Sequence, residues 1–131
     1  MSPLRALVVE DDSNNMEIIL KMLHAQNIET IAVSDPLHLK SVLESALAQG
    51  EIHLVFLDLE MPNADGYQVL EFLRGQIGAN TPVVACTVHF NEITRARNAG
   101  FHSFIGKPLS LARFPSQLQR LLAGQAVWET K

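Results

Sequence analysis

Short apolar segments alternate along the chain with segments whose apolar residues recur at helical spacing. The first apolar segment, residues 4–9, stops at an acidic cluster, and a run of this length and composition is typical of a strand. Residues 16–23 then repeat apolar side chains every three or four positions, which predicts a helix with one buried face. This alternation of a strand-like segment and a helical segment recurs to the end of the chain. We predict strands over residues 4–9, 30–33, 52–57, 81–87 and 101–106, and helices with apolar stripes over residues 16–23, 39–47, 69–77, 89–99 and 118–122.

The third apolar segment, residues 52–57, has few polar positions, so we expect it to be a central strand covered on both faces. Crossovers between parallel strands are right-handed, and they place successive helices on the two sides of a sheet. The alternation therefore predicts an α/β fold, a doubly wound five-stranded parallel sheet with helices on both faces. Residues 89–99 have a thin apolar stripe, and we expect that helix to be the least firmly packed.

Length and composition narrow the class of protein. The chain has 131 residues, within the usual span of one domain, and we place a single domain at residues 1–124 and a short tail at 125–131. A net charge of −4 argues against direct binding to nucleic acid. The sequence shows no secretory signal and no apolar run long enough to span a membrane, and its single cysteine, Cys86, predicts a cytoplasmic location.

Polar side chains follow four of the five predicted strands, at the edge where ligands bind in such sheets. They are Glu10, Asp11, Asp58, Thr87 and Lys107. Clustered carboxylates repel one another unless a cation lies among them, and an all-oxygen site with few protein ligands suits Mg²⁺. A carboxylate beside such an ion can attack phosphorus, while a lysine and a hydroxyl bind the remaining oxygens. Each residue alone also has a structural interpretation, as a helix cap or a strand exit.

Three motifs resemble those of one known family, the receiver domains of two-component response regulators. Residues 8–12 (VVEDD) resemble its first-strand acidic motif, residues 58–66 (DLEMPNADG) its phosphoacceptor loop, and residues 106–108 (GKP) its lysine motif. The resemblance extends from Leu4 to about Leu122. It implies a flavodoxin-like receiver fold with strand order 2-1-3-4-5.

The resemblance also implies a role for each of these residues. Asp58 would accept a phosphoryl group from a histidine kinase or a small phosphodonor, with Lys107 and Thr87 binding that group. Mg²⁺ would be held by Asp11, by Asp58 and by the backbone carbonyl of Glu60, and Glu10 would act through metal-bound water. The chain would then be no enzyme toward other substrates, since it would catalyse only its own phosphorylation and dephosphorylation.

A switch follows from the same resemblance. Thr87 would turn toward the phosphoryl group and Phe104 would follow it inward, although Phe104 also fits a plain core position. The surface of the fourth helix, fifth strand and fifth helix would change and bind a downstream target protein. The kinase-side partner would be a histidine kinase or a phosphotransfer protein, and activation would permit a homodimer. Val88 is larger than the residue usual at its position, and Glu60 and His89 lie where the family tunes the lifetime of the phosphoryl group.

Two other functions compete with this interpretation. Phosphatases of the haloacid dehalogenase family use similar groups, but their nucleophile lies on the first strand, whereas Asp58 follows the third. A receiver-like module that never uses phosphate and signals only through protein contacts is the main alternative. Trp128 in the tail fits either a partner contact or packing back onto the domain.

Overall fold

The computed structural model describes residues 3–130, so Met1, Ser2 and Lys131, which end the predicted domain and tail, lie outside the described residues. Six parallel strands form one sheet in the order β2-β1-β3-β4-β5-β6. The strands are β1 (Arg5–Val9), β2 (Glu29–Val33), β3 (Leu54–Asp58), β4 (Val83–Thr87), β5 (Ser103–Gly106) and β6 (Trp128–Glu129). The helices are α1 (Ser13–Ala25), α2 (Leu39–Gln49), α3 (Gly66–Ile77), α4 (Ile93–Ala99) and α5 (Phe114–Leu122), with 3₁₀ turns η1 (Pro36–His38) and η2 (Phe90–Glu92).

The predicted order 2-1-3-4-5 is confirmed, but the prediction of five strands is one strand short. Residues 128–129, predicted to be part of a tail, pair with β5 as β6. Two paired residues are too short a run to carry an alternating pattern, so no strand signal is present there. Trp128 therefore packs onto the domain, the second of its two sequence interpretations.

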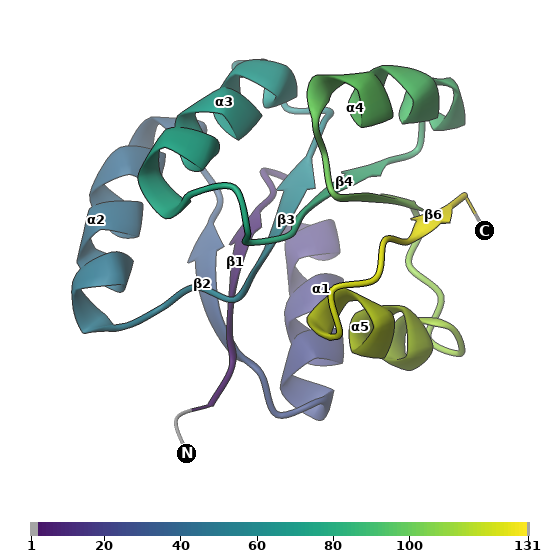
Figure 1. Ribbon diagram of the computed structural model, residues 1–131, viewed down its shortest axis with the longest axis horizontal. Helices are drawn as coiled ribbons and strands as arrows, with labels where there is room; N and C mark the ends of the chain where they lie inside the picture. Colours follow the sequence, from purple (N-terminus) through teal and green to yellow (C-terminus); the bar gives the residue numbers. More distant parts are fainter. Residues whose placement is uncertain (1–2, 131) are drawn as a thin grey trace.

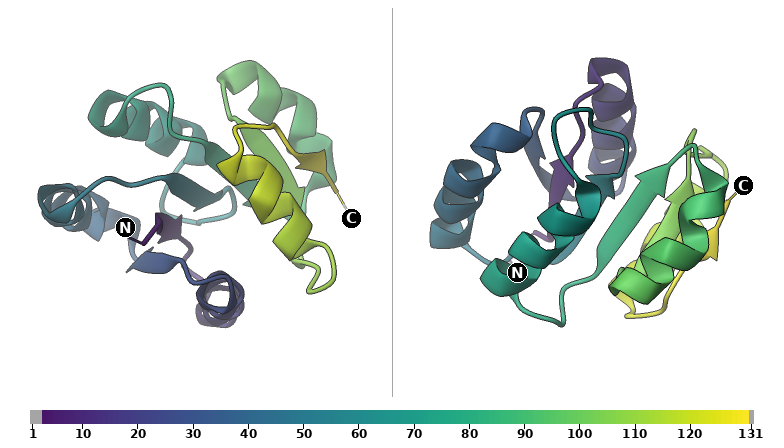
Figure 2. Two further views of the ribbon diagram at one scale, coloured as in Figure 1. Left: turned by 60° about the horizontal axis from the view of Figure 1, so that its bottom comes forward. Right: turned by 90° about the horizontal axis from the view of Figure 1, so that it is seen from above.

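Two helical layers cover the two faces of the sheet (Figure 1; Figure 2). Helices α2, α3 and α4 pack on one face, through residues such as Leu43, Leu73 and Ala96. Helices α1 and α5 pack on the other, through residues such as Leu23 and Leu118. β3 is buried along its whole length between them, as its composition predicted. No helix among residues 3–130 has the length and apolarity to cross a bilayer.

The predicted helix over residues 89–99 is divided into η2 and a seven-residue α4, in keeping with its thin apolar stripe. Of α4, only Ala96 is fully buried. Pro115 lies in the first turn of α5, where its missing N–H leaves no intrahelical hydrogen bond unmade.

Phe56 in β3 is expected to be among the costliest positions for truncation. Its side chain is 1% exposed and its ring centroid lies 5.9 Å from that of Phe114, so Phe56→Ala leaves a cavity between β3 and α5. We expect a loss of about 3–5 kcal/mol in the free energy of unfolding, measured by urea denaturation. Leu111, which is 79% exposed, supplies the control: Leu111→Ala is expected to change stability by less than about 0.5 kcal/mol. Equal losses in the two variants would contradict the packing described here.

Candidate functional site

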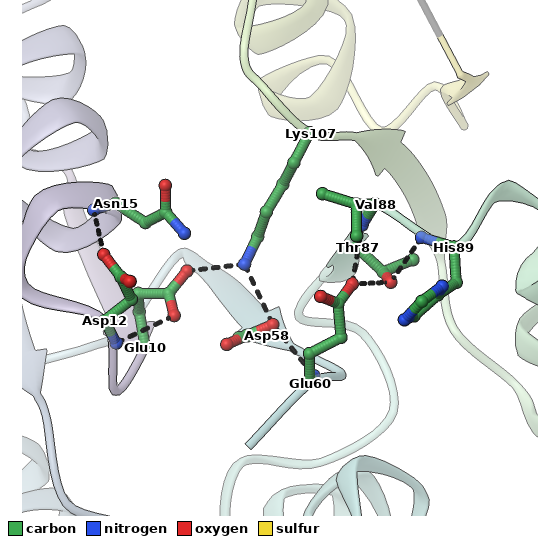
Figure 3. A network of polar contacts seen from close by, with 9 residues as sticks. All are labelled: Glu10, Asp12, Asn15, Asp58, Glu60, Thr87, Val88, His89 and Lys107. Carbon is green, nitrogen blue, oxygen red and sulfur yellow. Dashed lines mark hydrogen bonds and ion pairs between the residues drawn. The ribbon is translucent and has the colours of Figure 1, made fainter. Parts of the chain in front are cut away.

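The acidic cluster after β1 divides between a helix cap and the carboxyl edge of the sheet. Asp12 is the N-cap of α1, and its Oδ1 accepts a hydrogen bond from the Asn15 N–H at 2.9 Å. Glu10 is 4% exposed and its Oε2 accepts from the Asp12 N–H at 3.2 Å. The structural interpretation of this cluster therefore holds for Asp12, while Glu10 turns toward the strand ends (Figure 3).

Lys107 joins the ends of three strands. Its Nζ donates to Glu10 Oε1 at 2.7 Å and to Asp58 Oδ1 at 2.9 Å (Figure 3). Asp58 is the last residue of β3 and is 3% exposed, and Lys107 follows β5 directly. The sheet thus brings together residues that are 97 and 49 positions apart in the sequence. These contacts confirm that the polar strand ends predicted from the sequence converge.

Glu10, Asp11 and Asp58 form the one group of three or more carboxylates in residues 3–130 in which each residue offers an oxygen within 4.8 Å of those of the others. Glu10 and Asp58 are buried and Asp11 is exposed, so the cluster opens to solvent on one side. Oxygen ligands, few of them from protein and with room for water, are the set that Mg²⁺ prefers. The donor set therefore fits that ion.

The charge balance of the acidic cluster also favours a bound cation. Burial raises the pKa of Glu10 to about 7, and its hydrogen bond with Asp58 adds to the rise. Burial and the nearby Asp58 charge also raise the pKa of Asp11. Burial alone would raise the pKa of Asp58, but hydrogen bonds with Glu10, the Glu60 N–H and Lys107 lower it. Lys107 cannot neutralise three carboxylates, so the cluster holds negative charge that a cation would offset.

The raised pKa of Glu10 predicts how the metal-free protein responds to pH. Between its unfolded value, 4.5, and about 7 the folded chain binds more protons at Glu10 than the unfolded chain does. Stability from this group is therefore fully present below pH 4.5 and is lost as pH rises toward 7, by about 1 kcal/mol per pH unit at the steepest. Urea unfolding in EDTA from pH 5 to 8 is expected to show this loss in wild type relative to Glu10→Gln. A pH-independent difference between the two chains would contradict the burial of a titrating Glu10.

Thr87, the last residue of β4, faces the same edge but is engaged by a side chain that the sequence did not single out for this contact. Its hydroxyl donates to Glu60 Oε1, which also accepts from the Val88 N–H at 2.6 Å (Figure 3). Thr87 Oγ1 in turn accepts from the His89 N–H at 3.0 Å. The Glu60 N–H donates to Asp58 Oδ1 at 2.9 Å, so residue 60 contacts both strand ends. No spacing in the sequence reveals this contact, because it joins a loop residue to a strand end 27 positions further along the chain.

Two other residues singled out from the sequence lie beside this edge. Phe104 is fully buried among the residues that pack under α2, α3 and α4, so it has the surroundings of a core residue. The Val88 side chain is 50% exposed, although its N–H faces Glu60. The Lys107–Pro108 peptide bond that leaves the site is cis.

The fold and this edge together define a doubly wound α/β protein with an acidic site completed by a largely buried lysine. The family model for the response regulator receiver domain matches residues 6–119. The chain belongs to this family, which confirms the resemblance of its three motifs and its flavodoxin-like fold. Receiver domains are signalling domains of two-component systems.

Individual relatives agree with this assignment. The chain is 30% identical over 122 residues to two-component response regulator 24 of Arabidopsis thaliana, covering 92% of this chain and 85% of that protein. It is 28% identical over 124 residues to the osmosensing histidine protein kinase SLN1 of Saccharomyces cerevisiae, covering 92% of this chain but only 10% of that protein. The chain thus spans about a tenth of the length of one relative and most of another.

A solved structure is similar to this chain over most of its length. The receiver domain of the sensor histidine kinase PA1611 of Pseudomonas aeruginosa has a TM-score of 0.74 and 26% sequence identity, covering 93% of this chain and 99% of that one. That structure is described as having a magnesium ion coordinated in its active site cleft. The acidic cluster of Glu10, Asp11 and Asp58 is consistent with such an ion here.

Proposed function

We propose that this chain is a phosphoacceptor receiver in a two-component pathway, with Asp58 as the residue that takes the phosphoryl group. The observation that carries the proposal is the pair of buried contacts from Lys107 to Asp58 and Glu10 beside Asp11. A buried carboxylate with a lowered pKa stays ionised and is available as a nucleophile. Residues 1–124 would be the receiver unit, located in the cytoplasm, and 125–131 an extension.

The reaction is a transfer to an oxygen of Asp58. A carboxylate oxygen of Asp58 attacks phosphorus, the bond from phosphorus to the donor nitrogen breaks, and the nitrogen leaves with a proton. Asp11, Asp58 and the Glu60 carbonyl would hold Mg²⁺, with Glu10 acting through its water. When bound, the ion offsets the charge on the phosphoryl oxygens. Lys107 would hold one of those oxygens, and its Nζ, 2.9 Å from Asp58, supports this role.

Phosphorylation then requires a rearrangement at β4. The Thr87 hydroxyl and the Val88 N–H both donate to the Glu60 carboxylate in this structure. For Thr87 to reach a phosphoryl group on Asp58, its hydrogen bond to Glu60 must break. We expect this change to pass to Phe104 and the α4–β5–α5 face, where a target protein or a second copy would bind. The phosphoryl source would be a histidine kinase or a phosphotransfer protein.

The test is uptake of a phosphoryl group from phosphoramidate, followed by intact-mass measurement. We expect one phosphoryl group per chain in the presence of Mg²⁺ and none in EDTA. Beryllofluoride, which imitates an acyl phosphate, is expected to bind under the same Mg²⁺ conditions. If neither adduct forms, the chain is a receiver that signals by protein contact without phosphate.

A further inference from the structure

The C-terminal segment lies on a face that a receiver would use for its target. Residues 127–130, here called the strap, run along the outer edge of β5 between α4 and α5 (Figure 1; Figure 2). Trp128 is in register with Phe104 and Glu129 with Ile105. The Phe104 N–H donates to the Val127 carbonyl at 2.7 Å, and the Val127 N–H donates to Ser103 Oγ at 2.9 Å. The strap is therefore bound as an added strand.

Side chains of the strap occupy both sides of this edge. Val127 is fully buried in the layer under α1 and α5. Trp128 packs on the opposite layer, which contains Phe104, and its ring lies 4.4 Å from the Arg97 guanidinium of α4. Successive side chains of a strand point to opposite faces of the sheet. The apolar Val127 and the aromatic Trp128 therefore pack into the two layers on either side of the β5 edge.

The third strap residue, Glu129, is held by polar and charged side chains of α5. Glu129 Oε2 lies 2.8 Å from Arg120 of α5, and its Oε1 accepts from Gln117 Nε2 at 2.9 Å. Hydrogen bonds with Gln117 and Arg120, and the charge of Arg113, lower the pKa of Glu129. In a chain of net charge −4, arginines from α4 and α5 thus make this edge locally basic.

The backbone of β5 is built for a close neighbour. A Cβ on Gly106 would lie 2.5 Å from the Thr130 carbonyl oxygen and 2.6 Å from the Phe90 ring, so only glycine admits the strap there. The fit is nevertheless incomplete, because Gln117 Oε1 is buried without a hydrogen-bond partner among the described residues. A ligand that donated to this oxygen would bind better than the strap does.

We propose that the β5 edge between α4 and α5 is a docking groove for an extended acidic peptide segment of a partner protein, and that the strap is its tethered occupant. The partner would pair with β5 in parallel, place an apolar residue where Val127 lies and an acidic residue where Glu129 lies, and displace the strap. The proposal takes from the proposed function only that this face meets a target. Docking itself requires no phosphate.

The first measurement is amide hydrogen exchange in the full chain without phosphodonor. Val127→Asp places a charge in a buried apolar site, and we expect the Phe104 N–H to exchange at least tenfold faster than in wild type. Glu129→Arg, at a half-buried position, is a second route to the same release and guards against misfolding of the first variant. Glu44→Arg, an exposed residue on α2 with the same charge change, is the control and is expected to leave Phe104 unchanged. Unchanged exchange in both strap variants would overturn the proposal.

The second measurement is the binding of a free strap peptide to chains whose own strap is altered. Trp128 is the only tryptophan, so Trp128→Phe removes the tryptophan fluorescence of the chain. A peptide of residues 125–130 then reports its own docking through its tryptophan fluorescence. We expect the peptide to bind Trp128→Phe/Glu129→Arg saturably, with a dissociation constant of about 0.1–1 mM. A short tether supplies roughly millimolar effective concentration, so a segment of this affinity stays bound when it is tethered. Binding to Trp128→Phe alone is expected to be at least fivefold weaker, as is binding of a peptide carrying Glu129→Arg.

Two outcomes would overturn the groove: no binding to the strap-weakened chain, or equal binding with the strap intact. Phosphoryl uptake from phosphoramidate, measured on the same variants, separates this proposal from the proposed function. If the adduct forms but the peptide does not bind, only the groove is wrong. If the peptide binds but no adduct forms, only the phosphoacceptor role is wrong.

Discussion

Asp58→Asn is expected to abolish the Mg²⁺-dependent phosphoryl adduct, from one group per chain to none that intact mass detects. The amide keeps the shape of the carboxylate but has no anionic oxygen to attack phosphorus, and it removes one of the three clustered carboxylates. Because the neighbouring negative charge is lost, we also expect the pKa of Glu10 to fall from about 7 toward its ordinary value. Titration of the Glu10 carboxyl by NMR in wild type and variant checks this second effect.

Asp65→Asn is the matched control for this loss. Asp65 lies seven positions further along the same chain segment and is the N-cap of α3, where its Oδ1 accepts from the Tyr67 N–H at 2.8 Å. Asn caps helices about as well as Asp, so the control keeps the fold and is expected to keep the adduct. An adduct of equal yield on Asp58→Asn would show that another residue accepts the group.

Lys107→Met is expected to reduce both stability and phosphoryl uptake. Nζ is the shared partner of Glu10 and Asp58 in contacts of 2.7 and 2.9 Å, and the lysine side chain is 9% exposed. Removing one partner of a buried ion pair leaves uncompensated charge and costs about 3–5 kcal/mol. We expect a loss of that order at pH 8 in EDTA, decreasing as pH falls because the two carboxylates can then take up protons. Urea unfolding at several pH values measures both effects.

Lys21→Met is the control that shows how much of the stability lost in Lys107→Met comes from the burial of the ion pair. Lys21 forms an exposed pair with Glu17 at 3.0 Å, one helical turn away, and such pairs contribute about 0–1 kcal/mol. Phosphoryl uptake is expected to be unchanged in Lys21→Met and at least tenfold slower in Lys107→Met. If both variants lost equal stability, Lys107 would not be a buried partner of the two carboxylates.

Much of the fold follows from the sequence because most of its strands are apolar runs separated by amphipathic helices. β3 shows this most clearly, since a segment apolar on both faces has few alternatives to a central strand. β6 could not be found in this way. Its two residues, Trp128 and Glu129, owe their conformation to pairing with β5 and to Gln117 and Arg120, which are tertiary contacts without a local signature.

The convergence of the site was equally predictable, because parallel strands carry their carboxyl ends to one edge. Glu10, Asp58 and Lys107 meet there as their positions at strand ends required. The contact between Thr87 and Glu60 was not predictable, since the flexible glutamate side chain can reach several partners and the backbone pattern selects none of them. Asp12 was ambiguous in the sequence for a related reason, because a carboxylate after a strand suits a cap and a metal site equally.

Chemical mapping of the phosphoryl group tests the central claim most directly. An acyl phosphate reacts with hydroxylamine to give a hydroxamate and free phosphate, so treatment of the phosphoramidate product followed by proteolysis and mass spectrometry marks the acceptor. The account predicts a hydroxamate on Asp58 and on no other residue, in Mg²⁺ and not in EDTA. A hydroxamate on a different carboxylate, or a phosphoryl group that hydroxylamine does not remove, would contradict it.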